Sequence, residues 1–205
     1  MKPADHRLVL ILGTILTLLM LTPVSGFSQD RYEVGLRVND SAIECIAGME
    51  FTAMPGKMRI DANGLYEDDA YTMVGTSITF GDEVLTPGLT GRLGFRGVLG
   101  DFDRPGSDSN LVSAAFTLAA DYDLSSAYLS YYIPLVLHAD VNFGPSPVCF
   151  DDTEEYIEAN AGVDWMIIQN AALMLNLRYL EVEFDDPVKW QEDDWALYGG
   201  VKFRF

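Results

Sequence analysis

The stretch "WALYGGVKFRF", residues 195–205, closes the chain and decides between the possible fold classes. Apolar residues occupy its odd positions almost throughout, whereas Lys202 and Arg204 fall on even ones. Successive residues of a strand point to opposite faces, so this period predicts a β-strand with one apolar face. The last residues of a soluble chain usually fray in water. We therefore expect this face to lie against either a protein core or lipid.

The other end of the chain has the pattern of a secretory signal peptide. Lys2, His6 and Arg7 precede an uncharged apolar run, 8–21, and small residues follow it. The run is shorter than the roughly 20 residues that a spanning helix needs, which disfavours the alternative of an uncleaved anchor. We predict a signal peptide over 1–26, with cleavage after Ser28 as the alternative, and a single domain over 27–205.

The chain is strongly acidic, with 13 Lys and Arg against 31 Asp and Glu. An acidic surface disfavours nucleic acid as a partner.

Nothing after the apolar run resembles a spanning helix, and backbone groups in hydrocarbon must be hydrogen-bonded within the protein. If the mature chain enters a membrane, we expect it to do so as a closed β-barrel.

Alternating segments separated by turn residues predict ten antiparallel strands, with eight as the alternative. The ten expected strands are 31–38, 42–53, 57–66, 70–80, 87–99, 110–122, 127–143, 156–167, 172–184 and 195–205. No segment keeps a helical period, and no repeat or linker is visible. The longer connections 100–109, 144–155 and 185–194 alternate with tight turns, as in a barrel with both termini in the periplasm.

Aromatic residues lie near the ends of the apolar faces, where a membrane barrel has its two interfacial girdles. They are Tyr32, Phe51, Tyr66, Phe80, Phe143, Trp165, Trp195, Phe203 and Phe205. The sequence therefore favours an all-β, up-and-down transmembrane barrel over a soluble periplasmic β-sandwich. Between Leu177 and Leu180 the apolar residues change phase, which predicts a β-bulge near Tyr179.

The final strand also has the spacing of the assembly signal of bacterial outer-membrane barrels, in Tyr198, Gly200, Phe203 and Phe205. This predicts a location in the outer membrane of a Gram-negative bacterium. The expected partners are outer-membrane lipid and lipopolysaccharide and, during biogenesis, the barrel-assembly machinery and periplasmic chaperones. We expect a monomer.

A family resemblance appears in the last third of the chain. Residues 154–184 contain Tyr156 followed by "EANAG" at 158–162 and "RYL" at 178–180, and "YEDDAY" at 66–71 and "SYYIP" at 130–134 fit as well. With these segments the chain resembles the YfaZ family of small outer-membrane proteins. The resemblance implies an outer-membrane β-barrel and carries no catalytic residues.

Charged residues on the polar faces should lie inside the barrel. Those singled out as a lumen charge network are Arg37, Arg59, Asp61, Arg92, Arg96, His138, Asp140, Glu158, Asp164 and Arg178. Charges in a low-dielectric lumen pair with one another, and a barrel of about eight strands has room only for side chains. We expect a structural or surface-exposed protein whose lumen is mostly plugged by salt bridges. A narrow channel lined by Arg92 and Arg96 is the alternative.

The remaining acidic residues fall in the proposed outer loops, where hydration of the surface is the simplest role. Divalent cations prefer oxygen ligands, which makes Asp101, Asp103, Asp151 and Asp152 weak candidates for a metal site. Glu67 and Asp194 belong to the same set of outer acids. No zinc spacing, phosphate loop or dinucleotide motif is present, so we expect no cofactor.

An enzymatic role has little support. A hydrolase triad needs a His beside a nucleophile and an acid, and His138 has no neighbouring Ser in a motif. We expect no enzyme, with a barrel-borne hydrolase as the second alternative.

A disulfide between Cys45 and Cys149 is permitted in this compartment. Cys45 is expected on the lipid face, however, and Cys149 in a loop across the barrel. This placement disfavours the bond.

Overall fold

The computed structural model describes residues 31–53, 56–68, 70–104, 107–126, 133–185 and 190–205. The predicted signal peptide lies outside these residues. The elements are β1 (Arg31–Val38), β2 (Ala42–Ala53), β3 (Gly56–Glu67), β4 (Tyr71–Glu83), β5 (Leu89–Arg104), β6 (Ser107–Asp123), β7 (Leu135–Gly144), the 3-10 turn η1 (Ser146–Val148), β8 (Cys149–Asp151), β9 (Thr153–Ile168), β10 (Ala171–Phe184) and β11 (Trp190–Arg204).

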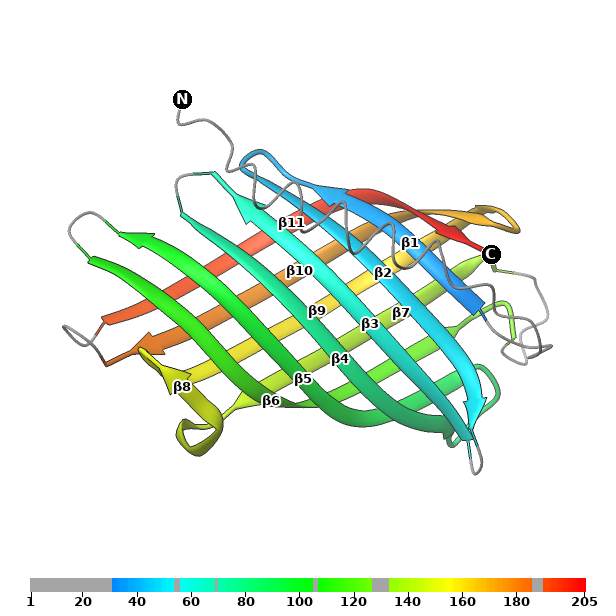
Figure 1. Ribbon diagram of the computed structural model, residues 1–205. Coiled ribbons are helices and arrows are strands. Elements are labelled where there is room, and N and C mark those ends of the chain that lie inside the picture. The colour runs from blue at the N-terminus through cyan, green and yellow to red at the C-terminus, as the bar shows by residue number, and fades with distance from the viewer. Residues whose placement is uncertain (1–30, 54–55, 69, 105–106, 127–132, 186–189) are drawn as a thin grey trace.

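These strands form one closed antiparallel β-barrel (Figure 1). Strands that follow one another along the chain pair with each other, except that β7 pairs with β9 and the short β8 pairs with β6. β1 pairs with β11 to close the wall. The closure includes Phe205, whose N–H donates to the carbonyl of Tyr32 at 2.9 Å. The predicted up-and-down barrel is confirmed, and the β-sandwich is wrong. Within the described residues, no helix has the length and apolar character needed to cross a bilayer.

The barrel has ten strand positions, because β7 and β8 share one of them. β7 pairs with β6 over Phe116–Asp123, and β8 pairs with β6 over Leu111–Ser113. Between them, Pro145 and Pro147 bracket the start of η1. Proline has no N–H to donate to the ladder, so the strand is interrupted here and resumes at Cys149. The alternative of eight strands is wrong.

Two expected outer connections are largely strand. β5 and β6 continue to Arg104 and from Ser107, and β11 begins at Trp190, whereas 100–109 and 185–194 were predicted as loops. The acidic residues in these segments resemble a loop composition, but a strand can carry acids on a solvated outer face. At the other end, β7 begins at Leu135. The first part of the predicted strand 127–143 lies outside the described residues, at 127–132.

The predicted bulge near Tyr179 is wrong. β10 pairs with β11 without interruption from Ala171 to Phe184, and its register with β9 shifts only at the two ends. Leu180 and Val182 are buried on the same face as Arg178. The strand therefore contains no extra residue. The change of phase marks the point at which apolar side chains, instead of charged ones, begin to face the lumen.

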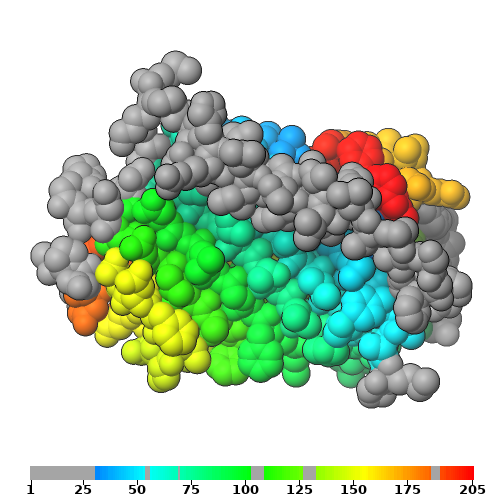
Figure 2. All heavy atoms as spheres, in the orientation of Figure 1, coloured from blue at the N-terminus to red at the C-terminus, as the bar shows by residue number. Residues whose placement is uncertain are grey.

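A belt of apolar side chains surrounds the wall. Outward-pointing members include Leu93, Phe95, Leu99, Phe116, Leu118, Leu137, Leu175, Leu177, Trp195, Leu197 and Phe203, all at least 42% exposed. The side chains of β2 to β6, cyan to green, make one continuous wall in Figure 2. We call the end of the barrel with Phe205 and the turn 84–88 the inner end, and the end with the β5–β6 and β10–β11 connections the outer end (Figure 1).

Acidic residues replace the apolar ones toward the outer end of the same outward faces. Asp101 follows Leu99 in outward phase, and Glu181 follows Tyr179. The Tyr179 and Trp195 rings are in contact at 4.7 Å between centroids, on paired residues of β10 and β11. The next outward pair is Glu181 with Asp193. An aromatic pair thus separates the apolar belt from an acidic outer rim.

Candidate functional site

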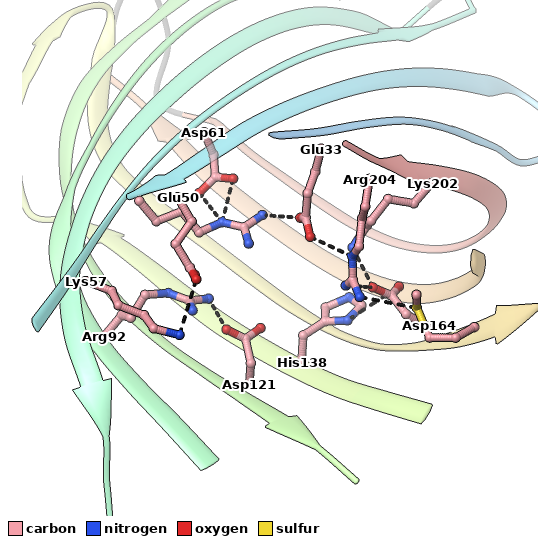
Figure 3. Close-up of polar contacts among 12 residues, drawn as sticks. Glu33, Glu50, Lys57, Asp61, Arg92, Asp121, His138, Asp164, Lys202 and Arg204 are labelled. Carbon is pink, nitrogen blue, oxygen red and sulfur yellow. Dashed lines mark hydrogen bonds and ion pairs between the residues drawn. The ribbon is translucent and has the colours of Figure 1, made fainter. Parts of the chain in front are cut away.

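The inner half of the lumen holds a network of ion pairs (Figure 3). Glu33 accepts from Arg204 Nε at 2.8 Å and from Arg59 Nη2 at 2.9 Å. Arg59 also binds Asp61 through Nε at 2.8 Å. β1, β3 and β11 contribute these residues, and all face inward because each strand alternates. The network therefore connects the two strands that close the barrel to β3.

A second group of ion pairs is joined to the first through Arg204. Lys202 Nζ binds Asp164 Oδ2 at 2.5 Å, and Arg204 Nη2 lies 3.6 Å from the same oxygen. His138 Nε2 is 3.1 Å from Asn176 Oδ1, and its Nδ1 is 3.9 Å from Asp164 Oδ1. The described residues supply no nucleophile beside His138, so it belongs to this polar network.

The deepest ion pairs lie halfway along the barrel. Arg37 Nη2 binds Glu44 Oε2 at 2.8 Å. Arg96 Nη2 lies 3.1 Å from Glu158 Oε2 and 2.9 Å from Asn63 Oδ1. A Cβ atom on Gly75 would lie 2.5 Å from Arg96 Nη2. Glycine at this position leaves the space that the guanidinium needs in order to cross the lumen.

These groups line a cavity of about 420 Å³. Its lining runs from Asp82, Glu83 and Asp123 at the inner turns to Glu44 and Glu158. The described lining residues include 11 acids and eight Lys or Arg side chains. Charged side chains in such a space keep water around their remaining donors and acceptors. The inner half of the lumen is therefore a polar cavity and not a filled core.

Apolar side chains fill the outer half of the lumen, and we call this cluster the plug. It consists of Ala42, Leu65, Tyr71, Met73, Val98, Phe102, Leu111, Ala115, Tyr156, Leu180, Val182, Phe184, Ala196 and Tyr198. Phe102 stacks its ring on Tyr71 at 4.8 Å and contacts Phe184 edge-on at 5.2 Å. None of these residues lines the cavity. The plug is thus packed like the interior of a soluble protein, and the charged cavity lies on its inner side.

Arg178 lies between the cavity and the plug. Its side chain is 1% exposed, with the guanidinium carbon 5.6 Å from the Tyr71 ring centroid and 5.3 Å from that of Tyr198. Its Nη2 donates to Tyr71 Oη and lies 3.2 Å from Asp194 Oδ2 and 3.8 Å from Glu67 Oε2. Glu67 and Asp194 were expected in outer loops. They lie on β3 and β11, where their side chains point into the lumen and lie close to Arg178.

The expected lumen residues occupy two places. Nine of the ten residues of the predicted network, Asp140 among them, line the cavity, whereas Arg178 lies at the plug. The expected salt bridges are present in the inner half of the lumen, but the apolar plug, rather than ion pairs, fills the outer half. Leu180, Val182 and Phe184 gave the signal for this plug, since they continue the phase of Arg178. That signal was interpreted as a bulge.

The candidate metal ligands do not come together. Asp152 Oδ2 accepts a hydrogen bond from the backbone N–H of Asn110 at 2.9 Å, and Asp151 adopts a positive φ of 59°. Asp101 lies on β5, and the side chain of Asp103 lies outside the described residues. Among the residues that the structure describes, no group of three or more His, Cys, Asp or Glu could hold a metal ion.

The residues of the predicted assembly signal divide between the two faces. Phe203 and Phe205 are outward and exposed, whereas Tyr198 is buried beside Arg178. Gly200 pairs with Arg37 of β1. Both cysteines are free, and Cys149, which was expected in a loop, lies on β8 with its Sγ 3.1 Å from the Gly144 carbonyl.

Comparisons with known proteins identify no family. No protein-family model matches the chain, and no curated protein matches it. Among solved structures, a chain described as "De novo design of transmembrane beta-barrels" is similar over 88% of this chain and 98% of its own, with 11% identity and a TM-score of 0.36. Membership of the YfaZ family stays a prediction.

Proposed function

We propose that this chain is an outer-membrane β-barrel protein of a Gram-negative bacterium, with a lumen sealed at the cell-surface end and a structural or surface-exposed role. The observation that carries the proposal is the reversal of polarity along the barrel. In the belt, apolar side chains face outward and charged ones inward. Above the Tyr179–Trp195 pair, acids such as Glu181 face outward and Phe184 faces inward.

Each level of this pattern suits a different surrounding medium. Lipid favours apolar outward residues, because an outward charge at the bilayer midplane costs about 2–4 kcal/mol. Water favours the opposite arrangement, since the burial of apolar surface stabilises the fold. A barrel that lies in lipid at its inner level and in water at its outer level needs both. This assignment places the acidic rim outside the cell and both termini in the periplasm.

The plug supports a sealed lumen over a conducting one. Tyr71, Phe102 and Phe184 contact one another by their rings, and each is at most 3% exposed. An ion that crosses the lumen would have to displace these rings or shed its hydration among them. The His138 network has no nucleophile in position among the described residues, so we propose no enzymatic activity.

Conductance in planar bilayers tests the seal. We expect the refolded protein, with its fold confirmed by heat-modifiable gel migration, to show no steady openings. We expect openings in the double variant Phe102→Ala/Phe184→Ala, because it removes two rings of the plug while leaving the cavity residues in place. Reproducible openings of the unmodified protein would overturn the sealed lumen in favour of the narrow channel.

Tryptophan fluorescence tests the membrane placement. Trp165 and Trp195 are outward, at 56% and 66% exposed, whereas Trp190 packs on Phe184 at 4.6 Å in the outer lumen. Variants that keep one tryptophan each, with Phe at the other two positions, would be refolded into vesicles of brominated lipid. We expect strong quenching of Trp165 and Trp195 and weak quenching of Trp190. Equal, weak quenching of all three would overturn the placement.

A further inference from the structure

The charges that line the cavity do not balance. Seven bases pair with seven acids; the bases are Arg37, Lys57, Arg59, Arg92, Arg96, Lys202 and Arg204, and the acids are Glu33, Glu44, Glu50, Asp61, Asp121, Glu158 and Asp164. Among the described lining residues, Asp82, Glu83, Asp123 and Asp140 have no Lys or Arg within ion-pair distance, and Arg31 is the base that remains. The cavity therefore has an excess of negative charge.

Asp140 is the unpaired acid that lies deep in the lumen. It points inward from β7, and the side-chain amides of Asn142 and Asn160 both donate to its Oδ2, at 3.0 and 3.1 Å. Its Oδ1 accepts no hydrogen bond from the described residues. A carboxylate inside a barrel is costly unless it is paired or hydrated. Oδ1 is thus a free anionic acceptor that is already held in position by two amides.

The other unpaired acids lie where the cavity meets the inner turns. Asp82 Oδ1 accepts from the backbone N–H of Glu83 at 2.8 Å, and Asp123 Oδ1 accepts from that of Ser125 at 2.9 Å. These hydrogen bonds hold the carboxylates without neutralising them. Charges of one sign at the mouth of a cleft raise the local concentration of ions of the opposite sign. Cations are therefore drawn toward the inner opening.

The free oxygen of Asp140 suits an ammonium group. An ammonium is a cation that donates three hydrogen bonds, so it can bind Asp140 Oδ1 and direct its other N–H groups to water in the cavity. Hard metal ions require about six to eight oxygen ligands in the case of calcium, more than one carboxylate oxygen and two amides supply. An anionic ligand would compete with the acids for bases that are already paired.

We infer that the cavity is a binding pocket for a small organic cation, entered from the inner end, with Asp140 as the anionic partner of an ammonium group. The volume of about 420 Å³ lies within the range of roughly 300–1,000 Å³ of small-molecule sites. This site goes beyond the structural role proposed above. It requires neither a sealed plug nor a particular membrane, so the two proposals fail independently.

Calorimetric titration of the refolded full chain in detergent tests this site, with diaminobutane as the probe. We expect saturable binding, and we expect Asp140→Asn to weaken it by about 30-fold or more, because loss of a buried charge partner costs at least about 2 kcal/mol. The matched control is Glu50→Gln, which removes a carboxylate that lines the same cavity but pairs with the half-exposed Lys57. It should change the affinity by less than about threefold.

A second variant keeps the test decisive if Asp140→Asn does not fold. Asn142→Asp places another carboxylate beside Asp140 and should tighten diaminobutane binding. Absence of saturable binding, or equal binding by Asp140→Asn, would overturn the proposal. So would equally tight binding of neutral butanediol, which would show that charge is not recognised. Displacement of diaminobutane by millimolar Mg²⁺ would reassign the cavity to inorganic cations.

Discussion

The inner and outer halves of the lumen are built from the same strands but packed in opposite ways. In the inner half, Glu33 and Asp164 bind two bases each around a cavity. In the outer half, Phe102 and Phe184 belong to a filled apolar cluster. β10 passes through both, with Arg178 at the boundary. Under the membrane placement proposed above, the polarity of an inward face follows the medium outside the wall at that level.

The reason is a difference in what drives packing. Where lipid surrounds the wall, burial of apolar side chains in the lumen would gain little over exposure to lipid, and paired charges can fill the interior. Where water surrounds the wall, apolar burial contributes about 25 cal/mol per Å². Apolar burial in the plug therefore stabilises the outer half of the barrel, whereas ion pairs stabilise the inner half.

The largest expected effect is at the boundary between the halves. Arg178→Ala leaves Glu67 and Asp194 without their base and removes the cation from the Tyr71 and Tyr198 rings. We expect a loss of about 3–5 kcal/mol in the free energy of unfolding, measured by denaturant titration in lipid vesicles. Arg31→Ala at the exposed inner end is the control and should change it by less than about 0.5 kcal/mol. Equal losses would contradict a special role for Arg178.

Truncation of the plug should come next. Phe102→Ala removes a ring that is 1% exposed and contacts two aromatic neighbours. We expect a loss of about 3–4 kcal/mol in the same titration. Phe95→Ala, which removes an outward ring that is 65% exposed, should cost less than half as much. The reverse order would mean that the outer lumen is not packed as a core.

A charged substitution on the outer wall tests where the apolar belt ends and the acidic rim begins. Leu118→Arg places a cation within the belt, where we expect a loss of about 2–3 kcal/mol in the free energy of unfolding from vesicles. Asp193→Arg places the same side chain on the acidic rim, one outward residue beyond Trp195. It should cost less than about 1 kcal/mol. Similar costs for both variants would move the boundary of the lipid away from the Tyr179–Trp195 pair.

The smallest effect is expected at the open end of the cavity. Lys57 binds Glu50 at 3.4 Å, and its side chain is 46% exposed. Lys57→Ala should change the free energy of unfolding by no more than about 1 kcal/mol, because water and salt screen the pair. A loss comparable to that of Arg178→Ala would contradict the view that the inner cavity is hydrated.

The sequence predicts which residues of each strand point into the lumen, but it does not predict where along the barrel the lumen is charged and where it is apolar. Period two assigns Arg92, Arg96 and Glu158 to the lumen directly, and the ion pairs follow from that side-chain placement. It also assigns Leu180 and Phe184 to the same face as Arg178. A change from charged to apolar residues on one face has two explanations, a bulge or a second core, and the pattern within one strand does not distinguish them. Only the register with β9 and β11 does.

Loop boundaries failed for a related reason. Acidic residues such as Asp101 and Asp193 predict loops by composition, but a strand above the belt tolerates outward acids as readily as a loop does. Their inward neighbours Phe102 and Asp194 could have corrected this, because they continue the alternation of β5 and β11.

The amino-acid sequence alone predicted a closed barrel of antiparallel strands with an apolar outer belt, and it favoured ten strands over eight. Alternation, turns and aromatic positions are local, and each strand carries them independently of its neighbours. The tertiary structure alone decided where the lumen is filled and where it is open. Tyr71, Phe102, Arg178 and Phe184 come from three different strands, and their contacts depend on the stagger between strands, which no single segment encodes. The unpaired state of Asp140 is likewise a property of the whole ring of strands, because it depends on which bases the other acids have already bound.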